Sequence, residues 1–497
     1  MSELGRLLRQ ASQYLAGRAG LMLLGFLSFP VLTRILPVAQ YGELALLLKI
    51  GVLWTVLSKC GLQNAALRFF PEQSKTSKNG KLSCASTLVL ESALCSFAMV
   101  FLGLALVKLH IVELGAQVAT IVPLLLTLVA IRSIQPTLSG LLRAEGRTWL
   151  FNICELSGRA LGIGLSLAGL CLIAIDLHYY VAGLVLAEGS VVVAVLVWFR
   201  LNGLLSVRSF NSTFAINAWC FSAPLIAYEL TSVVLDSGDR ILIGHYLGLR
   251  ELGLYSAAYS IATYAEEALM TPVNLALFPN YMRIWVEQGE EATSRFLSQA
   301  LELFLMAAAA VLLLVYVTSS DLIAILASRK FSAAHTLLPV LVGGLLVYAL
   351  HIFFNAPLLI HKQSIVLTGV TTGCCIANIA MNIVLLPRLG IMGAAVATLF
   401  SYVMLVVGLA LVSRRYLRIS LPINTLLCCT ALVWLIHSVE KLVATPVPWL
   451  NLVLKVPTAL IFYAAGLVVM RPRLRARLLA WLVPRLLLRG TLPAVEG

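Results

Sequence analysis

Long, uninterrupted apolar stretches constrain this chain more than any other feature of its sequence. A transmembrane helix needs about 20 consecutive apolar residues. About fourteen stretches of this kind occur, at 15–36, 44–67, 83–106, 116–138, 150–175, 179–199, 216–236, 252–280, 296–318, 336–360, 364–386, 391–412, 422–439 and 449–470. Lipid offers no water to backbone polar groups, so only helices and closed barrels cross a membrane, and barrel strands would alternate apolar and polar residues. The continuous stretches therefore predict an all-α polytopic membrane protein.

The composition agrees with this prediction and excludes other classes of protein. Of the 497 residues, 60% are hydrophobic and 12% are charged, and the mean hydropathy is +0.95. Soluble domains have about 45–50% apolar and about 25% charged residues, so the chain is neither a soluble enzyme nor a disordered protein. The connecting segments are too short for a catalytic domain and contain no GxxxxGK[ST] loop. The ten cysteines form no CxxC motif or metal-ligand cluster, so no cofactor and no metal are expected.

The formal charge of +14 is distributed unevenly between the two sides of the predicted helices. With the N-terminus inside, the inner segments and both termini hold 23 lysines and arginines, and the outer segments hold 8. Short cytoplasmic loops carry an excess of positive residues, so this distribution predicts that both termini are cytoplasmic. Because the positive residues follow the membrane topology, we expect no nucleic-acid partner.

An internal repeat predicts two similar halves. The segment 36–43 resembles 247–254, which places Gly42 and Gly253 at an offset of 211, and Pro123 and Pro339 follow a similar offset of 216. Chance similarity of short Leu/Gly strings is the alternative. Two halves with an even number of spans each would be related by a pseudo-two-fold axis along the membrane normal. The predicted organisation is an N-lobe of six helices at 1–210, a C-lobe of six helices at 211–418, two additional helices at 419–471 and a cytoplasmic amphipathic tail at 472–497.

Charged residues within the predicted spans are candidate functional groups, because each costs free energy unless it faces a cavity or a partner. The cations are Lys49, Lys59, Arg132, Arg159 and Lys455. Four of the five lie in the first half, which predicts a basic internal surface suited to an anionic cargo such as a diphosphate. The alternative is that these cations snorkel or pair, as Arg159 could with Glu155 four residues earlier.

Three carboxylates and one histidine are further candidates. Glu188, Glu229 and Glu266 are expected near mid-depth, where they would carry a coupled proton or neutralise the cations. His351 lies in a span with two prolines, Pro339 and Pro357, and the span at 116–138 also has two. Helices broken at matching positions in two halves point to a central cavity, although ordinary membrane helices also tolerate proline kinks.

Three separated motifs resemble those of one transporter family. They are Gly17-Arg18-Ala19-Gly20 with Phe29 to Pro37, Asp239 to Gly244 with Tyr255 to Tyr259, and Leu386-Pro387 with Leu389 to Thr398. The motifs resemble those of bacterial polysaccharide flippases of the multidrug/oligosaccharidyl-lipid/polysaccharide exporter superfamily. The resemblance covers nearly the whole chain.

The resemblance implies a transporter, not an enzyme, in the bacterial inner membrane. It would turn a polyprenyl-diphosphate-linked oligosaccharide between leaflets by alternating access, for O-antigen, capsule or exopolysaccharide biosynthesis. The diphosphate would be held by cavity cations, for which the candidates are Arg18, Arg34, Lys59, Arg132 and Arg159.

The partners would be the lipid-linked glycan, the bilayer and a polymerase or glycosyltransferases. A monomer is expected, since the repeat supplies both halves. The alternatives are a peptidoglycan-precursor flippase, a multidrug/cation antiporter and a membrane-embedded glycan polymerase.

Overall fold

The computed structural model describes residues 3–76, 78–109, 116–440 and 447–470, and this part of the chain is helical with no strand. The predicted tail at 472–497 lies outside the described residues. The helices are α1 (Glu3–Ile35), α2 (Val38–Lys59), α3 (Leu62–Thr76), α4 (Lys78–Lys108), α5 (Ala116–Ala144), α6 (Thr148–Leu172), α7 (Leu177–Leu201), α8 (Ser212–Tyr246), α9 (Leu249–Leu322), α10 (Leu338–Ala349), α11 (His351–Ile360), α12 (Ser364–Leu389), α13 (Ile391–Ser413), α14 (Ile423–Glu440) and α15 (Pro448–Met470). Short helical turns at Val207–Ser209, Ile323–Ala327 and Arg329–Thr336 connect some of them.

The predicted polytopic all-α fold is confirmed, with two differences in how the spans are built. Twelve helical segments of the described chain are long and apolar enough to cross a membrane. One of them, α9, contains two predicted spans joined at Gly289, where a φ of 79° produces a kink. The predicted span 44–67 lies within another of these segments, Val38–Gln73, but its helix breaks between α2 and α3, where Cys60 and Gly61 both take positive φ values.

The proline-containing spans behave differently in the two halves. Helix α5 continues through Pro123 and Pro136, so the first half has no break at this position. In the second half, α10 ends at Ala349 and α11 begins at His351. The first half therefore matches the alternative, in which a membrane helix tolerates its prolines, and only the second half has a broken helix.

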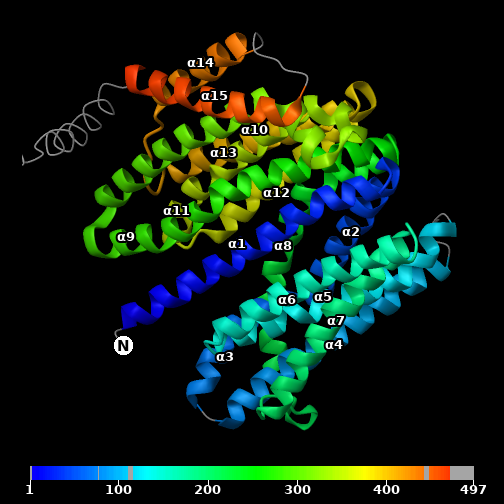
Figure 1. Cartoon of the computed structure of the whole chain (residues 1–497). Coiled ribbons are helices and arrows are strands. Elements are labelled where there is room, and N and C mark those ends of the chain that lie inside the picture. Colours follow the sequence, from blue (N-terminus) through cyan, green and yellow to red (C-terminus); the bar gives the residue numbers. More distant parts are fainter. Residues whose placement is uncertain (1–2, 77, 110–115, 441–446, 471–497) are drawn as a thin grey trace, which may run out of the picture.

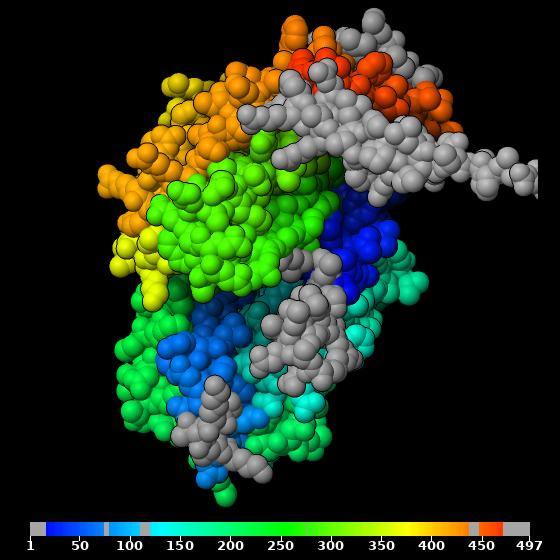
Figure 2. All heavy atoms as spheres, turned by 90° about the vertical axis from the view of Figure 1, so that its left-hand side faces the viewer, coloured from blue at the N-terminus to red at the C-terminus, as the bar shows by residue number. Residues whose placement is uncertain are grey.

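The helices form two lobes with α1 running between them (Figure 1). Helices α3 to α7 lie in one lobe, and α9 to α13 form most of the other. Helix α8 contacts α3 and α4 of the first lobe and α12 of the second, so it extends from one lobe to the other. Helices α14 and α15 pack against α9. Figure 2 shows the two lobes from the side, with later segments of the chain in light green, yellow and orange above the blue and cyan helices.

The lobes meet where the first turns of α2 and α9 cross. A Cβ atom on Gly42 would lie 2.0 Å from the carbonyl oxygen of Leu249, and one on Gly253 would lie 2.1 Å from that of Val38. Real Cβ atoms do not approach this closely, so both positions require glycine. Gly42 and Gly253 are the pair related by the predicted repeat, as are Val38 and Leu249, and the structure brings them into contact.

The outer surface carries large apolar side chains, as a protein in lipid requires. Phe101 of α4 and Ile365 of α12 are 76% and 88% exposed in the absence of a bilayer. Soluble monomers rarely expose large contiguous apolar patches. The core that joins the two lobes contains Leu36 and Tyr255, both fully buried.

Candidate functional site

A polar cavity of about 700 Å³ lies between the lobes. Its walls come from α1, which runs between the lobes, from α5, α6 and α7 of the first lobe, and from the part of α9 before Gly289, which we call the first arm. Its charged lining consists of Arg18, Arg132, Arg143, Arg159, Glu155, Glu188 and Glu267. The cavity therefore holds four cations and three carboxylates, in a chain whose spanning helices are otherwise largely apolar.

Arg132 and Glu188 neutralise each other across the cavity wall. The Arg132 Nε donates to Glu188 Oε2 at 2.8 Å, and its Nη2 donates to Oε1 at 2.6 Å. This two-pronged geometry is the strongest arrangement for a guanidinium and a carboxylate. The pair links α5 to α7 and leaves neither partner with an unmatched charge.

Glu155 is held by neutral donors of α5. Its Oε1 accepts hydrogen bonds from Ser139 Oγ at 2.8 Å and from Gln135 Nε2 at 3.4 Å. The helical ion pair between Glu155 and Arg159 that their spacing allowed does not form. The result is a row of hydrogen-bonding groups beside an arginine that Glu155 does not neutralise.

Three cavity arginines make no ion pair with any described residue. They are Arg18 of α1, Arg143 of α5 and Arg159 of α6. The Arg143 guanidinium lies 5.4 Å from the centre of the Phe151 ring, and its Nε donates to the Ser139 carbonyl at 3.4 Å. Arg18 and Arg159 are exposed to the cavity. Their guanidinium groups remain available for an anionic ligand.

The cavity continues into a smaller one of about 380 Å³. The smaller cavity shares Arg18, Arg143 and Glu155 with the larger one and adds Gly17 and Asn274. The first arm of α9 begins at Leu249, beside Gly42, and reaches Asn274 about 25 residues later, which is about 38 Å along a helix. The cavities therefore extend away from the glycine crossing, toward the opposite end of the bundle.

Two of the predicted diphosphate ligands lie outside this cavity. Arg34, near the other end of α1, donates from Nη2 to the Ile325 carbonyl at 2.8 Å. Lys59 forms an ion pair with Glu229 of α8, to which Gln63 also donates at 3.2 Å. The pairing of Lys59 with Glu229 matches the alternative in which intramembrane cations are neutralised.

The two remaining candidates also lie outside the cavity lining. Glu266 precedes the lining residue Glu267 on α9 but does not itself contribute to the wall. The His351 ring stacks against Tyr348 with centroids 4.4 Å apart, and its Nδ1 lies 2.6 Å from the Tyr348 carbonyl. His351 is thus packed within the C-lobe.

Four residues of the cavity lining were not among the predicted site residues: Ser139, Arg143, Glu155 and Glu267. A signal for the α5 residues was present, because Arg132, Gln135, Ser139 and Arg143 follow one another at intervals of three or four. Residues with this spacing share one face of a helix. The predicted span 116–138 ends before Arg143, whereas α5 continues to Ala144.

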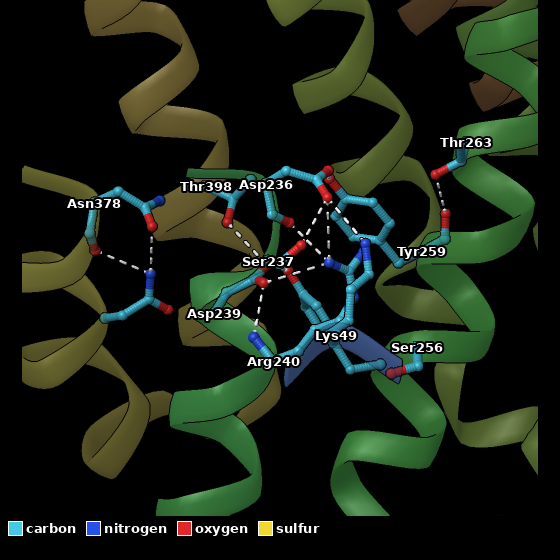
Figure 3. A network of polar contacts seen from close by, with 12 residues as sticks. Lys49, Asp236, Ser237, Asp239, Arg240, Ser256, Tyr259, Thr263, Asn378 and Thr398 are labelled. Carbon is cyan, nitrogen blue, oxygen red and sulfur yellow. Dashed lines mark hydrogen bonds and ion pairs between the residues drawn. The ribbon is translucent and has the colours of Figure 1, made fainter. Parts of the chain in front are cut away.

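A second polar site joins the lobes beyond the cavity (Figure 3). Lys49 of α2 donates to Asp236 of α8 at 2.9 Å, which links the N-lobe to the C-lobe. The Arg240 Nη1 donates to the Asp236 carbonyl at 2.7 Å and lies 3.8 Å from Asp239 Oδ1. The Arg240 guanidinium also lies 3.8 Å from the centre of the Tyr259 ring.

The carboxylates of this network are satisfied by hydroxyl groups as well. Tyr259 donates to Asp236 Oδ1 at 3.1 Å, and Tyr255 donates to Asp239 Oδ2. Thr398 of α13 lies 3.5 Å from the same oxygen of Asp239. Asp239 and Arg240 are 1% and 4% exposed, so this part of the network is buried, and each of its two acidic residues faces a cation.

The fold is that of a polytopic membrane protein with two lobes and a polar cavity between them, and comparison with known proteins agrees. The model of the family described as polysaccharide biosynthesis protein matches residues 7–285, more than half of the chain. The chain belongs to this family.

Two curated relatives share part of the sequence. The succinoglycan biosynthesis transport protein ExoT of Rhizobium meliloti is 23% identical over 305 residues, which are 58% of this chain and 56% of the relative. The probable low-salt glycan biosynthesis flippase Agl15 of Haloferax volcanii is 23% identical over 185 residues, 36% of this chain and 39% of the relative. The matched regions thus span about half the length of these relatives or less.

Solved structures confirm the fold. A lipid II flippase MurJ, in an inward closed conformation, superimposes with a TM-score of 0.72 at 13% identity and covers 94% of this chain and 99% of its own. An inward-facing multidrug resistance MATE family transporter of the MOP superfamily gives a TM-score of 0.65 at 12% identity, over 82% of this chain and 94% of its own. At these identities the similarity concerns the fold alone.

Proposed function

We propose that this transporter moves a polyprenyl-diphosphate-linked oligosaccharide across the bacterial inner membrane for surface polysaccharide biosynthesis. The observation that carries the proposal is the set of three arginines, Arg18, Arg143 and Arg159, that line the interlobe cavity without a carboxylate partner among the described residues. A guanidinium offers paired N–H donors that match the oxygens of a phosphate. Three such groups from three helices suit a diphosphate better than a neutral or cationic cargo.

The other cavity residues fit the glycan part of this substrate. Gln135, Ser139 and Glu155 present hydrogen-bonding groups to the cavity, and Phe151 and Tyr264 add aromatic rings. Polar groups of this kind bind sugar hydroxyls, and aromatic rings pack on sugar faces. In this proposal Arg132 and Glu188 keep the cavity wall in shape, while Arg18 and Arg159 contact the diphosphate. The cavity lining does not support a substrate-binding or coupling role for the other predicted residues, which are Arg34, Lys59, Glu229, Glu266 and His351.

The proposed alternating access is supported by the difference between the two ends of the interlobe region. At one end the backbones of α2 and α9 touch through Gly42 and Gly253, which leaves no passage between them. The cavity extends toward the other end, where Gly17 and Asn274 lie. If both termini are cytoplasmic, as the distribution of positive residues predicts, that end faces the cytoplasm, and the substrate would enter there. Separation of α2 from α9 would then release it on the other side.

The proposed substrate comes from glycosyltransferases that build glycans on a lipid diphosphate, and a polymerase would consume it. A peptidoglycan lipid precursor shares the diphosphate and is the alternative cargo. A cationic drug receives less support, because two of the three cavity carboxylates already have partners.

Deletion of the gene, followed by analysis of surface glycans, tests this proposal. The strain is complemented with wild type, with Arg159→Gln and with a control, Arg388→Gln, which removes an exposed arginine at the end of α12. We expect wild type and the control to restore one surface polysaccharide and Arg159→Gln to restore less than a tenth of it. Unchanged glycans together with altered drug sensitivity would contradict the proposal. Arrest of cell-wall synthesis instead would identify the peptidoglycan precursor.

A further inference from the structure

A second cavity lies on the C-lobe, away from the interlobe site. It has a volume of about 1350 Å³ and lies between the linker that joins α13 to α14 and the part of α9 after Gly289, which we call the second arm. The linker is fastened to this arm by two hydrogen bonds. Ser294 donates to the Arg418 carbonyl, and the backbone N–H of Ser420 donates to Ser298 Oγ at 3.0 Å. The structure thus forms a groove with fixed walls.

The groove is strongly basic. Its cations are Arg295, Arg414, Arg415 and Arg418, and its carboxylates are Glu290 and Glu291. Only Arg295 is paired among the described residues, at 3.5 Å from Glu291. Arg414, Arg415 and Arg418 are exposed and make no ion pair in the described chain. Three unmatched guanidinium groups on one short linker favour a ligand with more than one negative charge.

An apolar edge accompanies these charges. Leu421 and Ile423 line the groove and are 44% and 61% exposed. They lie where α13 has ended at Ser413 and α14 begins at Ile423, so the groove is at the end of two apolar helices. This is the end of the bundle opposite the Gly42 and Gly253 crossing, because the first arm of α9 runs from that crossing to Gly289. Charged and apolar groups therefore meet where lipid headgroups meet lipid chains.

We propose that this groove binds the headgroup of an anionic phospholipid. The arginines would bind the phosphate oxygens, and Leu421 and Ile423 would contact the first carbons of the acyl chains. A free phosphate ion would make no use of the apolar edge. The volume accommodates a headgroup with two phosphates. The bound lipid would tie the linker before α14 to the second arm of α9, and so hold α14 and α15 against the C-lobe. This inference is independent of the cargo proposed for the interlobe cavity.

Native mass spectrometry of the full chain in detergent tests this proposal with cardiolipin and phosphatidylcholine as probes. We expect wild type to retain cardiolipin at least tenfold better than phosphatidylcholine. The triple variant Arg414→Gln, Arg415→Gln, Arg418→Gln should reduce cardiolipin retention at least fivefold, and Arg415→Gln alone about twofold. The matched control is Arg68→Gln, Arg200→Gln, Arg208→Gln, which removes the same charge from the N-lobe. It should stay within twofold of wild type. Size-exclusion profiles and melting curves verify that each variant is folded.

Three results would overturn the proposal. Equal retention of the two lipids by wild type would show that the groove does not select a charged headgroup. An equal loss of cardiolipin in both triple variants would assign the effect to overall charge. Displacement of cardiolipin by a hundredfold excess of inorganic phosphate would assign the arginines to a soluble anion.

Discussion

The interlobe cavity and the network around Asp236 both place charges between the lobes, but they treat those charges differently. In the network, Arg240 contacts both Asp236 and Asp239, and tyrosine hydroxyls satisfy the remaining oxygens. In the cavity, Arg18 and Arg159 meet no carboxylate of the described chain. A buried charge without its partner is costly, so matched groups hold a structure together, while unmatched groups in a hydrated cavity are available to a ligand. The comparison separates structural charges from substrate-binding charges.

Asp239→Ala should produce the largest effect, because it removes one side of the buried pair formed by Asp239 and Arg240. The Arg240 guanidinium, 4% exposed, would lose the Asp239 carboxylate, and Tyr255 would lose its acceptor. Breaking a buried pair in this way costs about 3–5 kcal/mol. Thermal unfolding in detergent should show a large fall in the melting temperature, and the yield of folded protein should be low. A variant as stable as wild type would mean that the network is not structural.

Gly42→Leu should disturb the crossing of the two lobes, since a Cβ at this position would overlap the Leu249 carbonyl. Overpacking of this kind costs about 1–3 kcal/mol, which separation of α2 from α9 would relieve. We expect transport to fall and a cysteine introduced near the crossing to become more accessible to a membrane-impermeant maleimide. The control is Gly369→Ala in α12, where an added Cβ meets nothing within 4 Å. Unchanged labelling would show that the crossing does not close this end.

Arg159→Gln should leave stability nearly intact and reduce transport. The exposed guanidinium has no ion pair to lose within the described chain. Its removal should therefore change the free energy of unfolding by less than about 0.5 kcal/mol. Loss of one charge-assisted contact with a diphosphate corresponds to about 1.5–3 kcal/mol, and thus to at least about a tenfold loss of affinity. Binding of a polyprenyl diphosphate to the purified variant measures this effect. A strong loss of stability with unchanged binding would mean that Arg159 is a structural residue and does not bind the substrate.

The pair formed by Lys49 and Asp236 should contribute least. Their side chains are 30% and 48% exposed, so water screens their attraction. A double-mutant cycle with Lys49→Ala and Asp236→Ala should give a coupling free energy of about 0.5–1 kcal/mol. Chemical unfolding of the four proteins measures it. A coupling above about 2 kcal/mol would mean that this pair is as structural as Asp239 and Arg240.

The fold could be predicted from the sequence because lipid makes the apolar stretches decisive. The break between α2 and α3 could not, since it depends on the positive φ of Cys60 and Gly61, and cysteine carries no strong turn signal. The kink of α9 depends in the same way on Gly289, one glycine among 34 in the chain.

The sequence predicted a residue of the cavity lining only where its charge and its position in a spanning helix were enough to identify it. Arg132 and Arg159 reach the cavity because α5 and α6 turn these faces inward. Lys59 was an equal candidate by sequence, but its partner Glu229 lies 170 residues further along the chain, so no local pattern revealed the pair. Arg143 was missed because its helix extends beyond the apolar stretch.

The contacts at the crossing of α2 and α9 are those of a symmetric dimer. Gly42 packs on Leu249 while Gly253 packs on Val38, so each contact is the image of the other under the 211-residue offset. In a homodimer, an isologous interface repeats every substitution twice, once in each subunit. Here the two copies are separate positions of one chain, so each half of the interface can vary independently. The protein therefore combines the geometry of a two-fold interface with the freedom to make its halves bind different ligands.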